Sequence, residues 1–266
     1  MNRLLYCVLI VSCLSVHWSQ AKPPLDVTGE DDASQGAYNS GWGEGRNGGD
    51  GFGPWTLRTA TNEGAEHSHA GFYIAPTSEK KDLKGAAIRD KAFGLYANGT
   101  SFEVATAFRA FARPLRAGQS FSFLMEHGRF VKKFDVDDLT AGSVGIVLRS
   151  ATGAEGVNDY NKAARFEFGY YQGDTGAGYQ IFDGDRTKKL PLSLAEGGLA
   201  VTITLATENT YDLEITVLAK KQTTRLEGRR LGGEVGAEIR SFALFDRNGE
   251  TSDAYFNGFQ ILQPPE

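Results

Sequence analysis

One stretch constrains the fold more than any other, LAVTITLATENTYDLEITVL at residues 199–218. Apolar side chains occupy every second position across 201–205 and again across 211–217, with polar residues between them. A period of two is the pattern of a β-strand that has one buried face and one wet face. Both apolar sets stay on one face only if the connection has an odd number of residues. Residues 208–210 would meet this condition, with Asn209 tolerating a left-handed conformation, so the stretch predicts a β-hairpin.

Similar short segments recur along the chain, and turn signals such as Asn98-Gly99 and Asn248-Gly249 separate them. The 33 glycines and 8 prolines, without a long helical pattern, are typical of turns between short strands. The further predicted strands are 54–59, 70–75, 92–97, 102–111, 120–126, 143–150, 164–171, 179–182, 223–231, 239–246 and 254–262. This spacing predicts an all-β protein, a sandwich of two antiparallel sheets.

The first 21 residues predict a secretory signal peptide. Arg3 supplies the positive charge, residues 4–16 form an apolar core, and a small-x-small cleavage site ends at Ala21. The apolar run is shorter than the ~20 residues that span a bilayer. Both cysteines lie within this segment. We therefore expect a secreted protein, extracellular or periplasmic, whose mature chain has no disulfide and is held together by its core.

The remainder is predicted to be a short tether, residues 22–30, followed by a single domain, residues 31–263. Two longer loops, at 76–90 and 151–162, interrupt the strand pattern, and loops of this length are often functional or mobile. No later segment is apolar enough to predict a membrane span. The net charge of −5, with interspersed signs, gives no basic face for nucleic acid and no polybasic patch for lipid.

Several pieces of the chain combine glycines with aromatic or alternating apolar residues. They are AYNSGWGEGRNGGDGFGPW near the start, KAFGLYANG at 91–99, GSVGIVLRSATG at 142–153, TYDLEITVL at 210–218 and DAYFNGFQIL at 253–262. On these pieces, residues 31–262 resemble the concanavalin A-like lectin/glucanase superfamily. The resemblance implies a jelly-roll of two antiparallel sheets and, by analogy of fold, a role in carbohydrate recognition.

Within that superfamily the chain resembles a group of exported bacterial proteins that often carry a C-terminal sorting tail. Here the sequence ends in Gln263-Pro264-Pro265-Glu266, without an apolar tail or a basic cluster. The expectation is therefore a freely secreted product in place of one sorted to the cell surface.

Asp212 and Glu214 are the candidate catalytic pair. On a strand they share one face with Cα atoms roughly 6.5 Å apart, and a retaining glycosidase needs two carboxylates about 5 Å apart. Glucanases that the chain resembles place three acids at alternate positions, whereas here Thr210 and Thr216 flank the pair. The alternative is a solvent-facing polar row, which antiparallel sheets commonly have, and this row could also bind sugar hydroxyls without cleavage.

Aromatic faces beside polar side chains are the candidate sugar-binding groups. Tyr160 lies in a polar loop, where we expect it to be exposed, and Tyr171 is one of two adjacent tyrosines that must face opposite sides of a strand. Trp42 lies in the glycine-rich opening segment, where a core position is the alternative. We predict Tyr160, Tyr171 and Trp42 as ligand-binding residues.

Calcium is the cofactor that the loops favour, because hard oxygen donors are abundant there. Asp246, Asn248 and Glu250 surround a glycine turn, and Asp253 follows, so these four residues are the predicted ligands. A plain turn in which the side chains bond their own backbone is the alternative. A transition-metal site at His67 and His69 is a weaker possibility, because no third ligand with a known spacing is visible.

The sequence predicts, as its leading function, a secreted noncatalytic domain that binds carbohydrate or another extracellular polymer. A glycan-cleaving hydrolase that uses the paired carboxylates is the first alternative. A structural protein of the extracellular matrix or surface is the second. The pattern of strands alone does not choose between them, because one fold hosts many functions.

Overall fold

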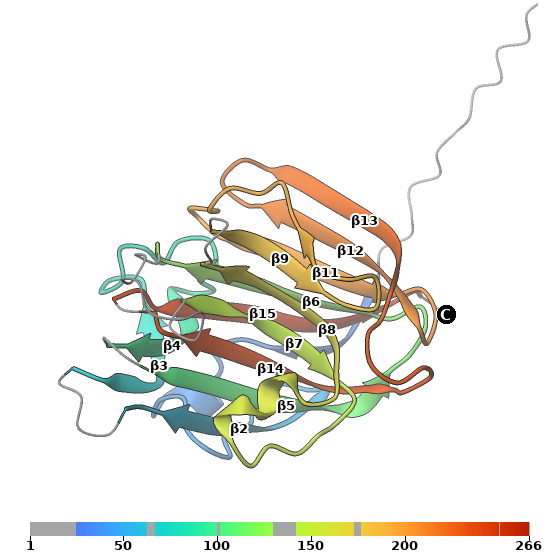
Figure 1. Ribbon diagram of the computed structural model, residues 1–266. Coiled ribbons are helices and arrows are strands. Elements are labelled where there is room, and N and C mark those ends of the chain that lie inside the picture. The colour runs from blue at the N-terminus through green and yellow to red at the C-terminus, as the bar shows by residue number, and fades with distance from the viewer. Residues whose placement is uncertain are drawn as a thin grey trace, which may run out of the picture.

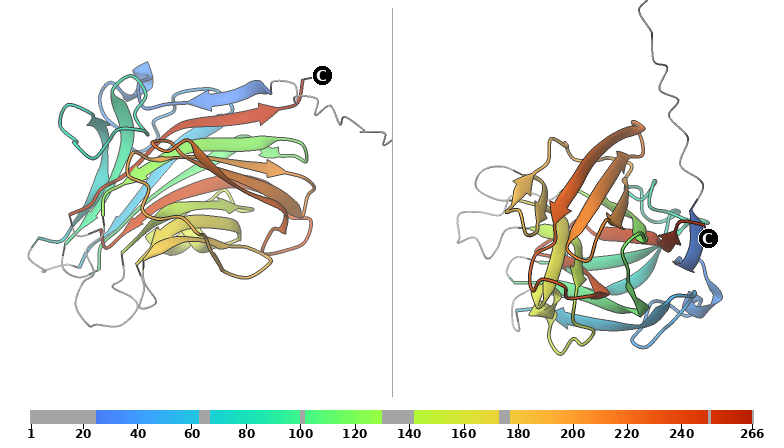
Figure 2. Two further views of the ribbon diagram at one scale, coloured as in Figure 1. Left: turned by 90° about the horizontal axis from the view of Figure 1, so that it is seen from above. Right: turned by 90° about the vertical axis from the view of Figure 1, so that its right-hand side faces the viewer.

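The structure, a computed structural model, describes residues 25–62, 67–99, 102–129, 142–172, 177–249 and 251–265. The predicted signal peptide and the first residues of the predicted tether lie outside the described residues. Two antiparallel sheets pack face to face (Figures 1 and 2), so the predicted all-β sandwich is confirmed. No α-helix occurs in the described parts of the chain, and none of their helices is long and apolar enough to cross a membrane.

The first sheet has eight described strands in the order β13-β12-β11-β6-β15-β4-β3, with β1 paired to β15. Their bounds are β1 Asp26–Asp31, β3 His69–Pro76, β4 Lys91–Asn98, β6 Ser120–His127, β11 Leu199–Leu205, β12 Thr210–Val217, β13 Gln222–Arg230 and β15 Ala254–Gln263.

The second sheet has seven described strands in the order β10-β9-β8-β7-β14-β5-β2. Their bounds are β2 Phe52–Ala60, β5 Val104–Leu115, β7 Ser143–Arg149, β8 Ala164–Tyr171, β9 Gly178–Phe182, β10 Lys188–Lys189 and β14 Ile239–Arg247. Short 3-10 turns lie at η1, Gly36–Tyr38, and η3, Val157–Asn161. In both sheets the central strands are far apart in the sequence, as Figure 1 shows for β15 beside β4 and β14 beside β5.

The predicted hairpin is strands β11 and β12. Its apolar residues are buried and its polar residues are partly exposed, in strict alternation. The last paired residues are Leu205 and Tyr211, so the connection is longer than the three residues expected, although its length is odd as predicted. The turn is built by Thr207, whose hydroxyl accepts hydrogen bonds from the backbone N–H groups of Asn209 and Thr210 at 3.1 Å. Asn209 does not adopt a positive φ.

The predicted tether is wrong over its second half, because residues 26–31 form strand β1 and pair with β15. The segment lacks a clear apolar alternation, since Val27 is exposed and only Gly29 and Asp31 are buried. Its pairing is made possible by Gly29, where a β-carbon would lie 3.0 Å from the Ile261 side chain. The first described strand thus joins the last strand of the chain, and the two ends of the domain close on each other (Figure 2).

The core lies between the sheets and is rich in aromatic rings. Trp55 packs edge-on against Phe242 with ring centroids 5.6 Å apart, and Phe121 and Phe242 are 5.0 Å apart. Strand alternation on both sheets supplies this layer, because every second residue points inward. The described residues contain no cysteine, so burial of such large rings is the main stabilising contribution available to them.

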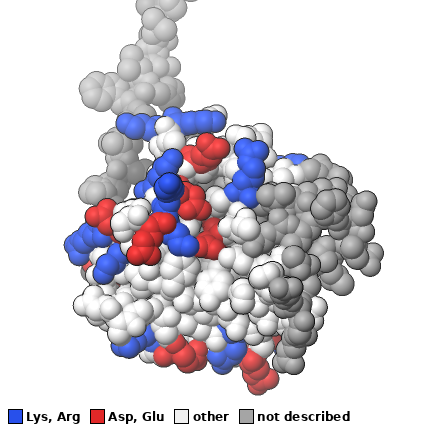
Figure 3. Space-filling view, turned by 90° about the vertical axis from the view of Figure 1, so that its left-hand side faces the viewer, with Lys and Arg blue, Asp and Glu red and all other residues white. Residues whose placement is uncertain are grey.

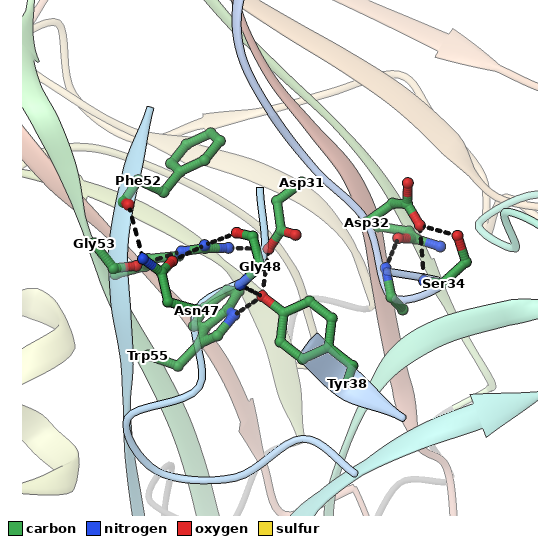
Figure 4. A network of polar contacts seen from close by, with 12 residues as sticks. Asp31, Asp32, Ser34, Tyr38, Asn47, Gly48, Phe52, Gly53 and Trp55 are labelled. Carbon is green, nitrogen blue, oxygen red and sulfur yellow. Dashed lines mark hydrogen bonds and ion pairs between the residues drawn. The ribbon is translucent and has the colours of Figure 1, made fainter. Parts of the chain in front are cut away.

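A buried ion pair lies beside this core. Arg109 on β5 contacts Asp31 on β1, and both side chains are fully buried. The Tyr38 hydroxyl donates to Asp31 at 2.6 Å and accepts from the Trp55 indole N–H at 3.1 Å, as Figure 4 shows. Arg109 also donates to the carbonyl of Gly48 at 2.7 Å. These contacts tie the glycine-rich opening segment to the second sheet.

Both long loops pack against outer sheet faces. Residues 77–90 cover part of the first sheet, where Leu83 and Ala86 are buried against Tyr255. Glu126 on β6 anchors this loop, because its Oε2 accepts the backbone N–H groups of residues 84, 85 and 86 at 2.8, 2.8 and 3.1 Å. Residues 151–162, which contain η3, pack on the second sheet through Tyr160. Both loops are therefore held in place over much of their length.

Candidate functional site

A cavity of about 870 Å³ opens on the outer face of the first sheet, at strands β3 and β4 and the start of β15. Because Phe72 and Ile74 pack against the core, strand alternation turns Tyr73 outward. Tyr96 on β4 likewise faces the cavity. We call this cavity the tyrosine pocket; its lining includes His69, Tyr73, Lys80, Tyr96, Asn98 and Asp253.

Glycines on the neighbouring strand make room for the two tyrosine rings. Gly94 lies opposite Tyr73 in the β3–β4 register, and Gly71 lies opposite Tyr96. A β-carbon at Gly94 would approach the Tyr73 ring to 2.7 Å, and one at Gly71 would collide with the Tyr96 hydroxyl. The rings are therefore free to lie over the sheet, with centroids 6.1 Å apart and planes inclined by 55°.

Asp253 provides the polar floor of the tyrosine pocket. Its Oδ2 accepts hydrogen bonds from the Tyr73 hydroxyl at 2.5 Å and from Lys80 Nζ at 2.8 Å. Its Oδ1 accepts one from Asn98 Nδ2 at 3.2 Å. Lys80 also lies 4.9 Å from the centre of the Tyr73 ring, in cation–π contact. These contacts fix a carboxylate, an amide, an ammonium and an aromatic ring relative to one another.

The hydroxyl of Tyr73 stays protonated at all ordinary pH values. Burial raises the pKa of Tyr73 far above its usual value, and the hydrogen bond to the Asp253 carboxylate raises it further. A tyrosine that donates to a carboxylate cannot lose its proton without placing two negative charges side by side. The Tyr73 ring is therefore a neutral surface with an oriented hydroxyl.

The charges on the end of the molecule drawn in Figure 3 are mixed in sign. Lysine and arginine side chains lie next to aspartate and glutamate side chains across its upper part, without a large patch of one sign. The coloured and white residues of this view, which are the described ones, form no continuous basic surface of the kind that tracks a nucleic-acid backbone.

The candidate catalytic pair lies on a different part of the first sheet. Asp212 and Glu214 are on β12, partly exposed, as the alternation predicted. Glu214 Oε2 accepts from Arg225 Nε at 2.7 Å, and Asp212 Oδ1 accepts from the backbone N–H of Gly228 at 2.8 Å. Both carboxylates thus bind the neighbouring edge strand, β13.

Of the three predicted aromatic ligands, Tyr160 is the clearest correction. It was expected to be exposed, but only 6% of its surface is accessible, because the η3 turn folds back on the second sheet and stacks its ring on Phe245 at 4.8 Å. Trp42 is only 4% exposed, in the core beside Trp55. Tyr171 is half-buried on the outer face of the second sheet, where its hydroxyl donates to Glu167.

The structure places the four predicted calcium ligands in different surroundings. Asp246 is fully buried at the end of β14, whereas Asp253 lies in the tyrosine pocket. The side chain of Asn248 accepts the backbone N–H of Glu103 at 3.0 Å, and Glu250 lies outside the described residues. In the parts of the chain that the structure describes, no group of three or more His, Cys, Asp or Glu side chains converges as a metal site, and His67 and His69 are exposed.

Sequence reasoning missed the residues that form the pocket, namely Tyr73, Lys80, Tyr96 and Asn98. The strands that carry them were predicted, and each tyrosine lies at an outward position of its strand. The missing information was the register that pairs Tyr73 with Gly94 and Tyr96 with Gly71. It depends on two strands separated by the 77–90 loop.

Comparison with known proteins finds similar structures but no family model and no curated protein that matches. The chain is similar to the carbohydrate recognition domain of Emp47p, with 11% identity, 91% of this chain and 98% of that chain covered, and a TM-score of 0.43. It is similar to lectin II from Ulex europaeus, with 10% identity, coverage of 79% and 98%, and a TM-score of 0.41.

A third similar structure is a beta-1,3-glucanase from Mycobacterium marinum, with 10% identity, coverage of 91% and 100%, and a TM-score of 0.41. Lectin-like domains and a glucanase are thus among the similar structures. At these identities and TM-scores, no ligand or site residue is transferred from them to this chain.

Proposed function

We propose that this protein is a noncatalytic carbohydrate-binding domain and that the tyrosine pocket is its binding site. The observation that carries the proposal is the placement of two tyrosine rings beside Asp253 and Asn98 in one open cavity. Ligand pockets typically combine apolar or aromatic walls with a few fixed polar groups. This pocket has both, and they come from β3, β4, the 77–90 loop and the residues just before β15.

A sugar ring can contact both the aromatic and the polar groups of the pocket. Its C–H face packs on an aromatic ring, while its hydroxyls both donate and accept hydrogen bonds. Asn98 Oδ1 is buried and accepts no hydrogen bond from the described residues, so an acceptor is available for a hydroxyl. Lys80 Nζ carries three donors, of which the contact to Asp253 uses one. The pocket can therefore donate a hydrogen bond to a sugar hydroxyl and accept one from it.

The pairing of Asp253 favours binding over cleavage. A glycosidase needs one carboxylate as nucleophile or base and a second as acid. Three donors, from Tyr73, Lys80 and Asn98, already occupy the Asp253 carboxylate. A carboxylate held in this way is well suited to orient a hydroxyl as a fixed acceptor.

The test is retention on polysaccharides by the full mature chain, with release of reducing sugar measured in parallel. Each measurement is made with calcium and with a chelator, because calcium is the cofactor expected from the sequence. Tyr96→Ala removes one aromatic wall, and loss of such a ring contact corresponds to about a fivefold to tenfold loss of affinity. Tyr171→Ala, a half-buried tyrosine on the other sheet, is the matched control.

The expected result is retention without sugar release, weakened by Tyr96→Ala and unchanged by Tyr171→Ala. Weakening by Tyr171→Ala alone would place the binding site on the second sheet. Release of reducing sugar would make the protein a hydrolase, and lack of retention across a broad panel would favour a structural role.

We also propose that the protein acts outside the cell that makes it, because residues 1–21 have the pattern of a secretory signal peptide. N-terminal sequencing of the exported protein tests this proposal. A mature chain that begins at Lys22 is expected, and retention of the protein in the cytoplasm would refute export.

A further inference from the structure

A second cavity, of about 570 Å³, lies next to the tyrosine pocket at the outer edge of β3, the last strand of the first sheet. Tyr73 lines both cavities, so they are neighbours. We call the second one the cationic cleft; its lining includes Ser40, Trp42, Arg46, Phe72, Ile74 and Lys91. Consecutive residues of β3 line it, whereas the side chains of one face alternate along a strand. The cleft therefore runs along the edge of the strand, between β3 and the glycine-rich opening segment.

The cationic cleft carries positive charge without a matching negative charge. Arg46 and Lys91 line it, and none of the described residues in its lining is acidic. Arg46 donates to the Ser40 hydroxyl at 2.5 Å, and neither cation makes an ion pair with a described carboxylate. On β13, by contrast, Arg229 and Arg230 both pair with aspartates. Two such cations in one cavity favour an anionic ligand.

The inner wall of the cationic cleft is apolar. Phe72 and Ile74 are half-buried, because β3 has no neighbouring strand on this side to cover them. Trp42 packs edge-on against Phe72, with ring centroids 5.3 Å apart. The indole N–H of Trp42 is buried and meets no acceptor among the described residues, although buried donors normally have one. The cleft thus offers donors and cations beside an apolar surface, and it lacks acceptors to match them.

We propose that the cationic cleft binds the carboxylate of a uronic acid, so that the glycan recognised by this protein is an acidic polysaccharide. The inference rests on the proposed binding of a glycan in the tyrosine pocket. One sugar residue packs on the rings of Tyr73 and Tyr96, and a uronic acid residue of the same polysaccharide presents its carboxylate to Arg46 and Lys91. A guanidinium group and an ammonium group both form charge-assisted hydrogen bonds with a carboxylate.

An acidic glycan fits this place better than an acidic peptide does. The edge of a strand can pair with an extended peptide, but Pro76 lines the cleft at the end of β3 and has no N–H for such a ladder. Tyr73 borders both cavities, so a single sugar chain can contact the two. The net charge of −5 gives the protein no general attraction for polyanions. Retention on an acidic polymer therefore requires a local cationic site.

The experiment compares the retention of the full mature chain on polygalacturonate with its retention on the fully methyl-esterified polymer, whose carboxyl groups carry no charge. Alginate is a second uronate polymer, and a chelator is present throughout so that divalent cations do not bridge carboxylates. Two ion pairs at the cleft predict an affinity about tenfold higher for the charged polymer. This preference should decline as sodium chloride is raised from about 0.05 M to about 0.5 M, because salt screens exposed ion pairs.

Arg46→Gln and Lys91→Gln each remove one charge from the cleft. Each should weaken retention on polygalacturonate about threefold to fivefold and leave retention on the esterified polymer unchanged. Arg240→Gln is the matched control, because it changes the net charge by the same amount at an exposed pair with Glu238 outside both cavities. This control should behave as the wild type does on both polymers.

Equal retention on the charged and esterified polymers would overturn the inference, as would an equal loss with Arg240→Gln. Retention on neutral polysaccharides but on neither uronate polymer would also overturn it, and each of these results leaves the proposed glycan binding intact. Lack of retention on every polysaccharide would instead refute the proposed function itself. Polyglutamate is added as a competitor that carries carboxylates on a peptide backbone. Competition as strong as that of soluble polygalacturonate would assign the cleft to an acidic peptide and overturn the inference.

Discussion

His127 gives the protein a built-in sensitivity to acid. It ends strand β6 with its ring between the two sheets, and 5% of its surface is exposed. Its Nδ1 lies 2.8 Å from the carbonyl oxygen of Gly128, so Nδ1 is assigned as the protonated nitrogen. Nε2, 3.0 Å from the Tyr179 hydroxyl, then accepts a hydrogen bond. The histidine is held in its neutral form, between the rings of Tyr170 and Tyr179.

Burial lowers the pKa of His127 from 6.5 to about 4, and the hydrogen bond to Gly128 opposes this only in part. The unfolded chain therefore binds a proton near pH 6.5, whereas the folded chain binds it only near pH 4. The free energy of unfolding should fall as pH drops through this window, because the unfolded state binds more protons there. The difference in pKa corresponds to about 3 kcal/mol at the acid end.

Urea unfolding between pH 7.5 and pH 4, followed by tryptophan fluorescence, measures this effect in the wild type and in His127→Gln. Other groups titrate in the same window, among them Asp31, whose pKa burial raises to about 6. The informative quantity is therefore the difference between the two proteins at each pH. Wild type should lose about 3 kcal/mol relative to the variant as pH falls. A difference that does not change with pH would refute the assignment of a buried neutral His127.

Three further predictions follow from other contacts. Glu126→Ala should lower the free energy of unfolding by about 3 kcal/mol, because three backbone N–H groups of the loop lose their acceptor. The loosened loop should be cut by trypsin at Lys80 and Lys84, and resistance to trypsin equal to that of the wild type would contradict the anchoring role. Arg109→Met should cost about 3–5 kcal/mol in urea unfolding, because it leaves Asp31 buried without its cation, and a smaller loss would mean that Asp31 is neutral. Glu214→Gln should change Tm by no more than about 2 °C, because its pair with Arg225 is exposed, and it should leave glycan retention unchanged; loss of a glycan-cleaving activity would restore the catalytic hypothesis.

The strands were predictable because their signal is local. In β11 and β12 every second residue is apolar, and the structure buries those residues. The register of the hairpin followed from the same pattern, since slippage by one residue would expose the whole apolar face. The length of the turn and the left-handed conformation expected of Asn209 were wrong, because the threonine hydroxyl that organises the turn is not part of the alternation.

The errors occurred where burial depends on distant partners. Strand β1 has little apolar character, and Asp31 is buried because Arg109, from β5, meets it. Tyr160 lies in a polar loop, and its burial follows from a 3-10 turn that lays the ring on Phe245. Neither contact leaves a periodic trace in the sequence. From the sequence alone, such residues are predicted to lie in a tether or an exposed loop, because the partner that buries them is distant in the sequence.

The same limit explains why the candidate site differs from the predicted one. A search for carboxylates at alternate positions finds Asp212 and Glu214, which lie next to each other on one strand. The tyrosine pocket is assembled from β3, β4, the 77–90 loop and the residues just before β15. Among its residues, Asp253 stood out in the sequence as a candidate calcium ligand and His69 as a weaker transition-metal candidate. Asp253 stood out because it follows a glycine turn rich in oxygen donors, and in the structure it lines the pocket.

The position of Lys80 in the tyrosine pocket depends on a contact outside the pocket, between Glu126 on β6 and the 77–90 loop. Lys80 reaches Asp253 from the 77–90 loop, and that loop is held by the Glu126 carboxylate through three backbone N–H groups. Binding sites that are fixed before the ligand arrives avoid the entropy cost of ordering. Loss of the Glu126 anchor should therefore weaken glycan retention, although Glu126 does not line the pocket. The loop that the sequence marked as functional or mobile would then act as a fixed wall of the site.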